Sequence, residues 1–400
     1  MTHNGPLMRE RSKRGNTMQI TDVTGILVNS GWRKHFLFVK VEKDAGISGW
    51  GEAYTQVDRE RTVAVQVEEL ARYAVGRSPF DIKHFTQMVY NDFAGRRSSM
   101  ELASAQSAIE IAMWDIVGRA LDQPIYNLLG GPCREEIRVY ANGWYTFLET
   151  AQEYADEAQR MVALGFDAIK FDPFPNPWRT FIPSAHEDHA VAVVEAVRQA
   201  VGPDVDLLLE FQRRLAPMHV VRLTERLEEF RPYWLEEPGP VDNLDAIAEV
   251  RAATHIPVVT GEALYSKAGF SPLLEKRCAD IVNPDVCCVG GILELKEIAA
   301  MAEPNLVAVS PHNFNSTTLG LAATVQASAM ISNFIITEYF VPFEAIGKEI
   351  CPDGLGLENG KIRLPKGPGL GIDMDEAALA RHPYHAFEKR RLRQPRDEGS

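Results

Sequence analysis

Short apolar runs recur through the second half of the chain, and each leads into an ionisable residue. The runs are "LLLE" with Glu210, "YWLEE" with Glu236, "IPVVTGE" with Glu262, "ADIVNPD" with Asp285, "NLVAVSPH" with His312 and "NFIITE" with Glu338. These residues stand 23 to 27 positions apart. Between them, apolar residues recur three and four positions apart, for example in "PMHVVRLTERLEEF", and this spacing predicts helices. A buried strand, a helix and two loops account for one such repeat.

Two earlier runs, "EIRVYANGW" and "FDAIKFD", extend the series to eight strands that alternate with helices. This alternation predicts an α/β fold in the form of a (β/α)8 barrel, which we place at residues 138–359. In such barrels the carboxyl ends of the strands meet at one face, where active sites lie. We therefore expect the polar residues at the strand ends to converge on one pocket.

The residues before the barrel follow a different pattern. "HFLFVKVEKDAGISGWGEAYT" alternates like a hairpin, and "SAQSAIEIAMWDIVGRALDQPIYNLLGG" reads as helical. We assign residues 18–137 to a separate α+β capping domain, completed by the Pro- and Gly-punctuated tail at 360–400. The polar, basic residues 1–17 lack the apolar core of a secretory signal, and we expect a disordered leader before Met18.

Composition and charge narrow the classes of partner. The 400 residues are 45% hydrophobic and 24% charged, as in ordinary globular enzymes. The formal net charge of −13 argues against nucleic acid and against an anionic membrane surface. No apolar run reaches membrane-spanning length. Five cysteines, few and odd in number, favour a reducing cytoplasm over a disulfide framework. A small-molecule substrate remains the expected partner.

Three glutamates end three successive strands, so Glu210, Glu236 and Glu262 should be neighbours. Carboxylates this close repel one another unless a cation joins them, and oxygen ligands favour Mg²⁺ before Mn²⁺. No His/Cys set at zinc spacing competes, and we expect the pair His382 and His385 to lie at the surface. A metal at such a site binds a substrate carboxylate and stabilises the enediolate formed when the α-proton leaves.

The remaining strand ends supply candidate proton-transfer groups. His312 is a candidate base, and Asp285 is placed to bond its other ring nitrogen and raise its basicity. Lys170, at the end of the second strand, would serve as a second base or hold the substrate carboxylate. Glu338 would donate a hydrogen bond to the enediolate if burial kept it protonated, or would otherwise be part of an ion pair.

Taken together, these motifs resemble the enolase superfamily, mandelate racemase subgroup. The resemblance rests on "AIEIAMWDIVGRALDQPIYNLLGG", "LLLE", "WLEEP", "TGE", "NPDVCCVGGI", "SPHN" and "PKGPGLGI", and it covers nearly all of the chain after the leader. It implies a (β/α)7β barrel under an α+β cap built from the N-terminal region and the C-terminal tail. It also implies proton abstraction α to a carboxylate and a homo-oligomer. Residue by residue, it makes Glu210, Glu236 and Glu262 the Mg²⁺ ligands and His312–Asp285 the base dyad.

The chain departs from the racemase pattern at the second strand. Racemases of the subgroup carry Lys-x-Lys there, whereas this chain has "KFD", with Lys170 and then Asp172. A two-base racemization is therefore disfavoured. "KFDPF" and "WLEEPGPVDN" instead resemble the sugar-acid dehydratases of the subgroup.

A second departure concerns the general acid. Many of these dehydratases have a histidine two residues after the third-strand ligand, where this chain has Gln212. An amide cannot donate a full proton at neutral pH. We take Gln212 and Asp172 as candidate substrate-binding residues. Arg213 or Arg214 would bind the far end of the substrate or would be solvated, and Arg214 is our candidate.

Loops of the capping domain would close over the barrel mouth and set specificity. Trp32, His35, Tyr54 and Arg59 are candidates in those loops, and ordinary surface residues of a hairpin are the alternative for each. We take Tyr54 as the candidate substrate-binding residue among them.

Three functions remain open from the sequence. The first is a Mg²⁺-dependent hydro-lyase that converts a sugar acid to a 2-keto-3-deoxy acid. In it, either His312 also protonates the leaving group in a syn elimination, or the leaving group needs no acid beyond the metal. The second is a cycloisomerase or epimerase that uses the same enediolate, favoured by Gln212. The third is a non-catalytic ligand-binding relative, against which the intact His312–Asp285 pair argues.

Overall fold

The computed structural model describes residues 18–395 except 33, 45, 93–98, 177, 315 and 390, so the proposed leader at 1–17 lies outside the described residues. The N-terminal region opens with an antiparallel sheet of β1 (Ile20–Asn29), β2 (His35–Lys43) and β3 (Ser48–Ala53) in that order. Four helices follow, namely α1 (Glu60–Ala74), α2 (Ile82–Asp92), α3 (Met100–Leu121) and α4 (Ile125–Leu128).

Helix α3 lies against the face of the N-terminal sheet and is buried on most of its sides. Two glycines of β3 permit the close approach. A Cβ on Gly51 would lie 1.9 Å from the carbonyl oxygen of Ala108, and one on Gly49 would lie 2.2 Å from that of Ala112. The sequence "GWG" in β3 therefore fixes how near the helix and the sheet can come.

Eight parallel strands form the barrel. They are β4 (Glu136–Asn142), β5 (Ala168–Phe171), β6 (Asp206–Glu210), β7 (Trp234–Glu236), β8 (Val258–Thr260), β9 (Ile281–Val282), β10 (Ala308–Val309) and β11 (Thr337–Phe340). Consecutive strands from β4 to β10 pair in parallel. A parallel bridge between Val309 and Phe334 links β10 to the start of the last strand, and β11 pairs with β4. The sheet thus closes on itself, and the predicted fold class is confirmed.

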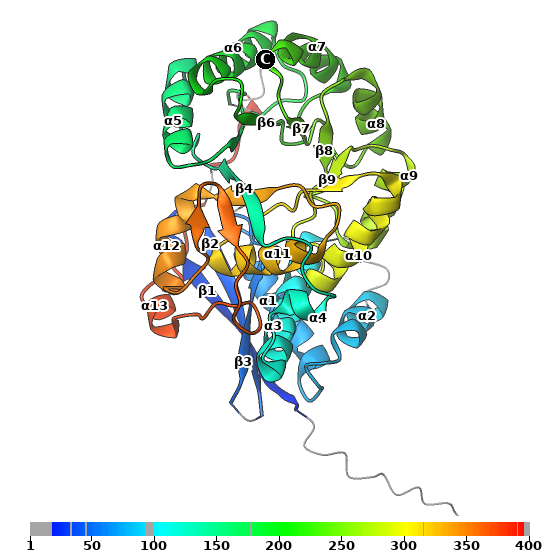
Figure 1. Ribbon diagram of the computed structural model, residues 1–400, viewed down its shortest axis with the longest axis vertical. Helices are drawn as coiled ribbons and strands as arrows, with labels where there is room; N and C mark the ends of the chain where they lie inside the picture. The colour runs from blue at the N-terminus through cyan, green and yellow to red at the C-terminus, as the bar shows by residue number, and fades with distance from the viewer. Residues whose placement is uncertain are drawn as a thin grey trace, which may run out of the picture.

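A helix follows each of the first seven barrel strands. These are α5 (Ala151–Ala163), α6 (Ser184–Val201), α7 (Pro217–Leu227), α8 (Leu244–Ala253), α9 (Ser266–Glu275), α10 (Ile292–Ala302) and α11 (Thr318–Met330). Short 3₁₀ turns lie at Glu228–Phe230, Glu303–Asn305 and Val341–Phe343. The last strand is followed only by the short α12 (Glu344–Ile350), which gives the (β/α)7β form. In Figure 1, α5 to α8 border the barrel at the end far from the N-terminal sheet.

The barrel interior is layered by the period of two along each strand. One apolar layer consists of Tyr140, Ala168, Leu208, Trp234, Val259, Ile281 and Ile336. Because side chains alternate along a strand, the residue two positions further on points into the same interior. Those next residues are Asn142, Lys170, Glu210, Glu236, Gly261, Asn283 and Glu338. An apolar plug therefore lies directly beneath a polar layer at the carboxyl ends of the strands.

The C-terminal tail contacts both parts of the molecule. After β12 (Leu357–Glu358), β13 (Lys361–Arg363) pairs antiparallel with β4 of the barrel. Beyond it, Asp115 of α3 accepts the backbone N–H of Leu370, and Arg119 pairs with Asp373. The helix α13 (Glu376–Ala380) lies beside β1 and β2 in Figure 1, where Glu376 pairs with Lys40.

Two buried carboxylates of the N-terminal region cap helices of the barrel. Glu110 of α3 accepts the backbone N–H groups of Ile292 and Leu293, at the start of α10, at 2.8 and 2.9 Å. Glu52 of β3 accepts the N–H and hydroxyl of Thr317 and the N–H of Gly320, at the start of α11. The backbone N–H groups at the start of a helix lack acceptors within the helix, so the two buried carboxyl groups that accept them join the cap to the barrel.

Among the described residues, no helix combines the length and the apolar character needed to cross a bilayer.

Candidate active site

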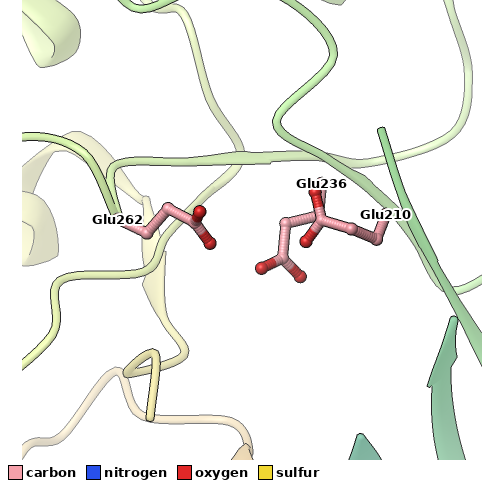
Figure 2. A group of neighbouring side chains, drawn as sticks. All are labelled: Glu210, Glu236 and Glu262. Carbon is pink, nitrogen blue, oxygen red and sulfur yellow. The ribbon is translucent and has the colours of Figure 1, made fainter. Parts of the chain in front are cut away.

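Three glutamates converge at the carboxyl end of the barrel. Glu210 and Glu236 end β6 and β7, and Glu262 follows β8 by two residues. One carboxylate oxygen from each lies within 4.8 Å of the others, and Figure 2 shows the three carboxylates facing a common space. Burial, together with the charges of Glu236 and Glu262, raises the pKa of Glu210 well above its ordinary value. Three carboxylate oxygen donors that converge in this way fit a hard divalent metal ion.

Lys170 contacts the carboxylates from β5. Its Nζ lies 2.7 Å from Glu236 and 3.6 Å from both Glu210 and Glu338. Burial alone would lower the pKa of Lys170, but the charges of Glu236 and Glu338 hold it well above its ordinary value. A lysine that stays protonated favours holding a substrate anion over acting as a base.

His312 and Asp285 form a buried pair after β10 and β9. The ring Nδ1 of His312 lies 2.7 Å from Asp285 Oδ2, and the other Asp285 oxygen accepts the N–H of Cys287 at 2.8 Å. This pairing leaves Nε2 facing the site, 3.1 Å from Glu262 and 3.8 Å from Glu338. Burial opposes the charged ring, but the charges of Glu262 and Glu338 and the bond to Asp285 raise the pKa of His312 well above its usual value. The geometry is that of an oriented base with one nitrogen toward the site.

Glu338 is fully buried within β11, between Lys170 and His312. Its oxygens accept hydrogen bonds from the Asn142 side chain and from the Asn313 backbone N–H. Asn283 similarly donates to Glu236 at 3.1 Å. The sequence interpretation did not single out these three asparagines. The expectation that polar residues at the ends of the barrel strands converge on one pocket could have found Asn142 and Asn283, since each lies two residues beyond an interior apolar residue.

The substrate-binding candidates near β5 and β6 differ in their contacts. Asp172 pairs with Arg214 and accepts the N–H of Phe174 at 3.0 Å. The Arg214 guanidinium also lies over the rings of Phe174 and Trp178, at 5.2 and 5.0 Å. The structure thus brings Asp172 and Arg214 together in one buried pair, and their binding of a substrate stays a prediction.

Gln212 stands in a left-handed turn just beyond Glu210. Its φ is +49° and that of Arg213 is +61°. The turn brings the Gln212 N–H back to Glu210 Oε1, 2.6 Å away. It also sends Arg213 sideways, where its Nη1 pairs with Glu262. Two consecutive non-glycine residues in this region are strained, which is common at functional sites.

The capping region contributes aromatic residues to the site. The Tyr54 ring lies 6.2 Å from that of His312, and the Lys34 ammonium lies 5.3 Å from the Tyr54 ring. Trp32 packs against Phe340, the last residue of β11, and against Phe343 in the turn that follows. The other two loop candidates lie in different settings: His35 is buried beside Glu60, and Arg59 is exposed and pairs with Glu101. Of the four, Tyr54 is the one that contacts the base dyad.

A closed (β/α)7β barrel with three convergent carboxylates and a His–Asp pair defines the enolase class of fold and site. Family models agree: the mandelate racemase/muconate lactonizing enzyme N-terminal domain matches residues 21–130, and the enolase C-terminal domain-like family matches residues 153–378. The chain therefore belongs to the enolase superfamily, in the mandelate racemase/muconate lactonizing enzyme family.

Individual relatives are similar over most of the chain. D-gluconate dehydratase of Thermoproteus tenax is 35% identical over 88% of this chain and 70% of its own length. D-xylonate dehydratase of Haloferax volcanii is 34% identical over 91% and 89%. D-galactonate dehydratase of Ralstonia pickettii is 36% identical over 90% and 94%. Among solved structures, a mandelate racemase/muconate lactonizing enzyme from Sulfitobacter sp. has a TM-score of 0.87 at 31% identity, covering 94% of this chain and 99% of its own.

Proposed function

We propose that this chain removes water from a sugar acid by abstracting the proton α to the carboxylate, giving a 2-keto-3-deoxy acid. Similarity to dehydratases over most of the chain makes it an enzyme of the hydro-lyase class. The observation that carries the chemistry is the His312–Asp285 pair, whose second ring nitrogen lies 3.1 Å from Glu262, one of the three glutamates. Proton abstraction beside a carboxylate needs both a base and a concentrated positive charge, and this site can hold both.

We propose Mg²⁺ as the metal, held by Glu210, Glu236 and Glu262. Oxygen-only donors favour Mg²⁺ or Mn²⁺ over zinc, and the mutual repulsion of the three carboxylates supports a divalent cation. When bound, the metal supplies positive charge that stabilises the substrate carboxylate as the α-proton leaves.

Different side chains transfer the proton and bind the negative charge of the substrate. His312 Nε2 takes the α-proton, and Asp285 holds the ring in the required orientation. Lys170 stays protonated and binds a substrate carboxylate oxygen, while Glu338 lies beside both groups. The electrons of the broken Cα–H bond move into the substrate carboxylate and give an enediolate. They then form a Cα=Cβ bond as the Cβ–O bond breaks. The hydroxyl leaves with a proton as water, and the resulting enol tautomerises to the 2-keto acid.

The residue at position 212 determines which group protonates the departing hydroxyl. An amide is no acid at neutral pH, so His312 would return the proton that it took, on the same face of the substrate. This predicts a syn elimination. Tyr54, Asp172, Gln212 and Arg214 are our candidates for contacts to the remaining hydroxyls.

Proton NMR in D₂O tests the proposal, with Mg²⁺ and a panel that includes gluconate, galactonate and xylonate. We expect loss of one α-proton signal and growth of 2-keto-3-deoxy product signals, with the rate at least ~10³-fold lower in His312→Asn. Glu187→Gln, which alters a buried carboxylate bonded to His219, is the control for unspecific effects of substitution. Loss of water without α-proton loss, or unchanged turnover by His312→Asn, would contradict the mechanism.

Gln212 also favours a second candidate function. Without an acid for the leaving group, the same enediolate could be reprotonated to an epimer or an isomer. In the NMR experiment this reaction would exchange the α-proton for deuterium and give a product of the same composition as the substrate.

We also propose a domain division and an assembly state for this chain. We divide the chain into a cap of residues 18–137, completed by 360–400, and a barrel of 138–359. We also expect a homo-oligomer, as the family resemblance implies.

A further inference from the structure

We propose that Arg213 is a positioning residue that holds Glu262 in the metal-free protein and moves to Glu237 when the metal binds. The inference rests on the metal site proposed above. It concerns a residue beside the three glutamates and not one of the ligands themselves.

Glu262 lies between two cationic or ionisable groups in this structure. Its Oε1 pairs with Arg213 Nη1, and its Oε2 faces His312 Nε2 at 3.1 Å. Glu210 and Glu236, in contrast, lie beside Lys170. A divalent metal that binds all three glutamates would compete with Arg213 for the negative charge of Glu262, and a guanidinium displaced in this way would need another anionic partner.

Glu237 is placed to be that partner. It is buried, and one of its oxygens accepts the Thr260 hydroxyl at 3.0 Å and the Gly261 N–H at 2.8 Å. The other oxygen, Oε2, is buried without a hydrogen bond among the residues that the structure describes. It lies 3.9 Å from Arg213 Nη1, so a shift of about 1 Å would bring the two atoms within hydrogen-bond distance.

The backbone and the space around Arg213 suit such a movement. Its N–H donates to the carbonyl oxygen of Glu237 at 2.8 Å, which ties the two residues together whichever carboxylate the side chain binds. The side chain borders a cavity of about 570 Å³ that is also lined by Asp242, Leu264 and Tyr265. The Arg213 side chain is therefore not enclosed by packed neighbours on every side.

Charge balance gives the physical reason for two positions. Without metal, Arg213 compensates Glu262, and buried carboxylates would otherwise face one another unpaired. With metal, the ion compensates Glu262, and Arg213 compensates Glu237. Exchanging one ion pair for another costs less than breaking a buried pair outright, so Glu237 should favour metal binding although it is not a ligand.

The test is a titration of the metal-free protein with Mn²⁺, in which the electron paramagnetic resonance signal of unbound Mn²⁺ measures the affinity. We expect Arg213→Met to tighten binding about tenfold, because the competitor is gone. Glu237→Gln should weaken binding about tenfold, because Arg213 has lost its second partner. In the double variant the weakening by Glu237→Gln should nearly vanish, so that its affinity stays within about threefold of Arg213→Met. Arg222→Met, which removes a half-exposed arginine that pairs with Glu187, is the charge control and should leave the affinity unchanged.

The double variant separates exchange of partners from simple electrostatics. If Arg213 and Glu237 acted only through their charges, the two effects would multiply, and that result would overturn the inference. Weaker binding by Arg213→Met would also overturn it, because Arg213 would then be orienting Glu262 for the metal. If the wild type bound no Mn²⁺, or bound it unchanged after Glu262→Gln, the proposed metal site itself would fail.

Discussion

Gln212 combines an unusual backbone with an unusual side chain for its place. Its φ of +49° lies in a region that few non-glycine residues adopt, and its N–H is committed to Glu210. The turn therefore presents whichever side chain stands at 212 beside a proposed metal ligand. Histidine is among the residues that tolerate this conformation, so the position can accept an acid without rebuilding the loop.

Replacing Gln212 by His should speed the release of the hydroxyl. A protonated imidazole would supply the acid that the amide lacks, and general acid catalysis is worth about 10²- to 10⁴-fold. Single-turnover rates of water loss, followed by quenched flow, measure the effect. Gln212→Asn keeps the turn and supplies no acid, so it is the matched control. If His and Asn variants eliminate water equally slowly, leaving-group protonation does not limit this enzyme.

At the level of single residues, the polar residues at the strand ends predicted where the cluster lies. They did not predict which side chains contact one another. Glu210, Glu236, Lys170 and Glu338 could be foreseen because each follows an interior apolar residue by two positions. Arg213 could not be assigned a partner, because its direction depends on two left-handed residues and on Glu262, which lies 49 positions away. Their convergence in space is observed, and their catalytic roles stay predictions.

At the level of elements, Glu110 shows why a buried helix carries a charged residue. It stands in "AIEIAMWD", its Oε1 accepts the Trp114 indole N–H, and its two oxygens cap α10. The cap of α10 also requires Gly291, whose φ is +101° and where a Cβ would lie 2.1 Å from Glu110 Oε2. A single carboxylate and a single glycine thus define how α3 meets α10.

Glu110 should make stability depend on pH. Burial raises its pKa from 4.5 to about 8, against the effect of its N–H donors. The folded state then retains a proton that the unfolded chain has lost, so the contribution of Glu110 to stability is full below pH 4.5 and declines until about pH 8.

Glu110→Gln cannot titrate and resembles the protonated form. Its free energy of unfolding, relative to that of the wild type, should therefore rise between pH 5 and pH 8, by an amount on the order of a few kcal/mol. Urea unfolding at one-unit pH intervals measures this difference. A gap between the two proteins that is constant with pH would show that Glu110 keeps the same charge when folded and unfolded.

Periodicity was a better guide to elements than to their neighbours. All eight predicted barrel strands are present. They could be predicted because the spacing of apolar residues differs between buried strands and helices. The short β13 was not predicted. It pairs with β4 through backbone hydrogen bonds, and the pattern of side chains does not indicate which strand the backbone of β13 pairs with.

At the scale of the whole molecule, the N-terminal region depends on the end of the chain. Asp115 accepts the N–H of Leu370, Arg119 pairs with Asp373, and Lys40 pairs with Glu376. The packing of α3 and of the sheet is therefore completed by residues that follow the barrel in sequence.

Ending the chain at Leu364 should loosen the cap more than the barrel. We expect backbone amides of α3 and β3 to lose protection from hydrogen exchange by about 10²-fold or more, because buried groups such as Asp115 lose their partners. A chain ending at residue 389 keeps all three contacts and is the matched control. Mass spectrometry of exchanged peptides distinguishes the two regions, and unchanged protection of α3 would refute the dependence.

The contact between Asp115 and Leu370 also sets an order of events during synthesis. The two residues are 255 positions apart, so at ~5–20 residues per second the ribosome adds Leu370 roughly 10 to 50 s after Asp115. Throughout that interval Asp115 lacks the N–H group that Leu370 later donates. The cap can therefore reach its final packing only after the segment around Leu370 has been synthesised.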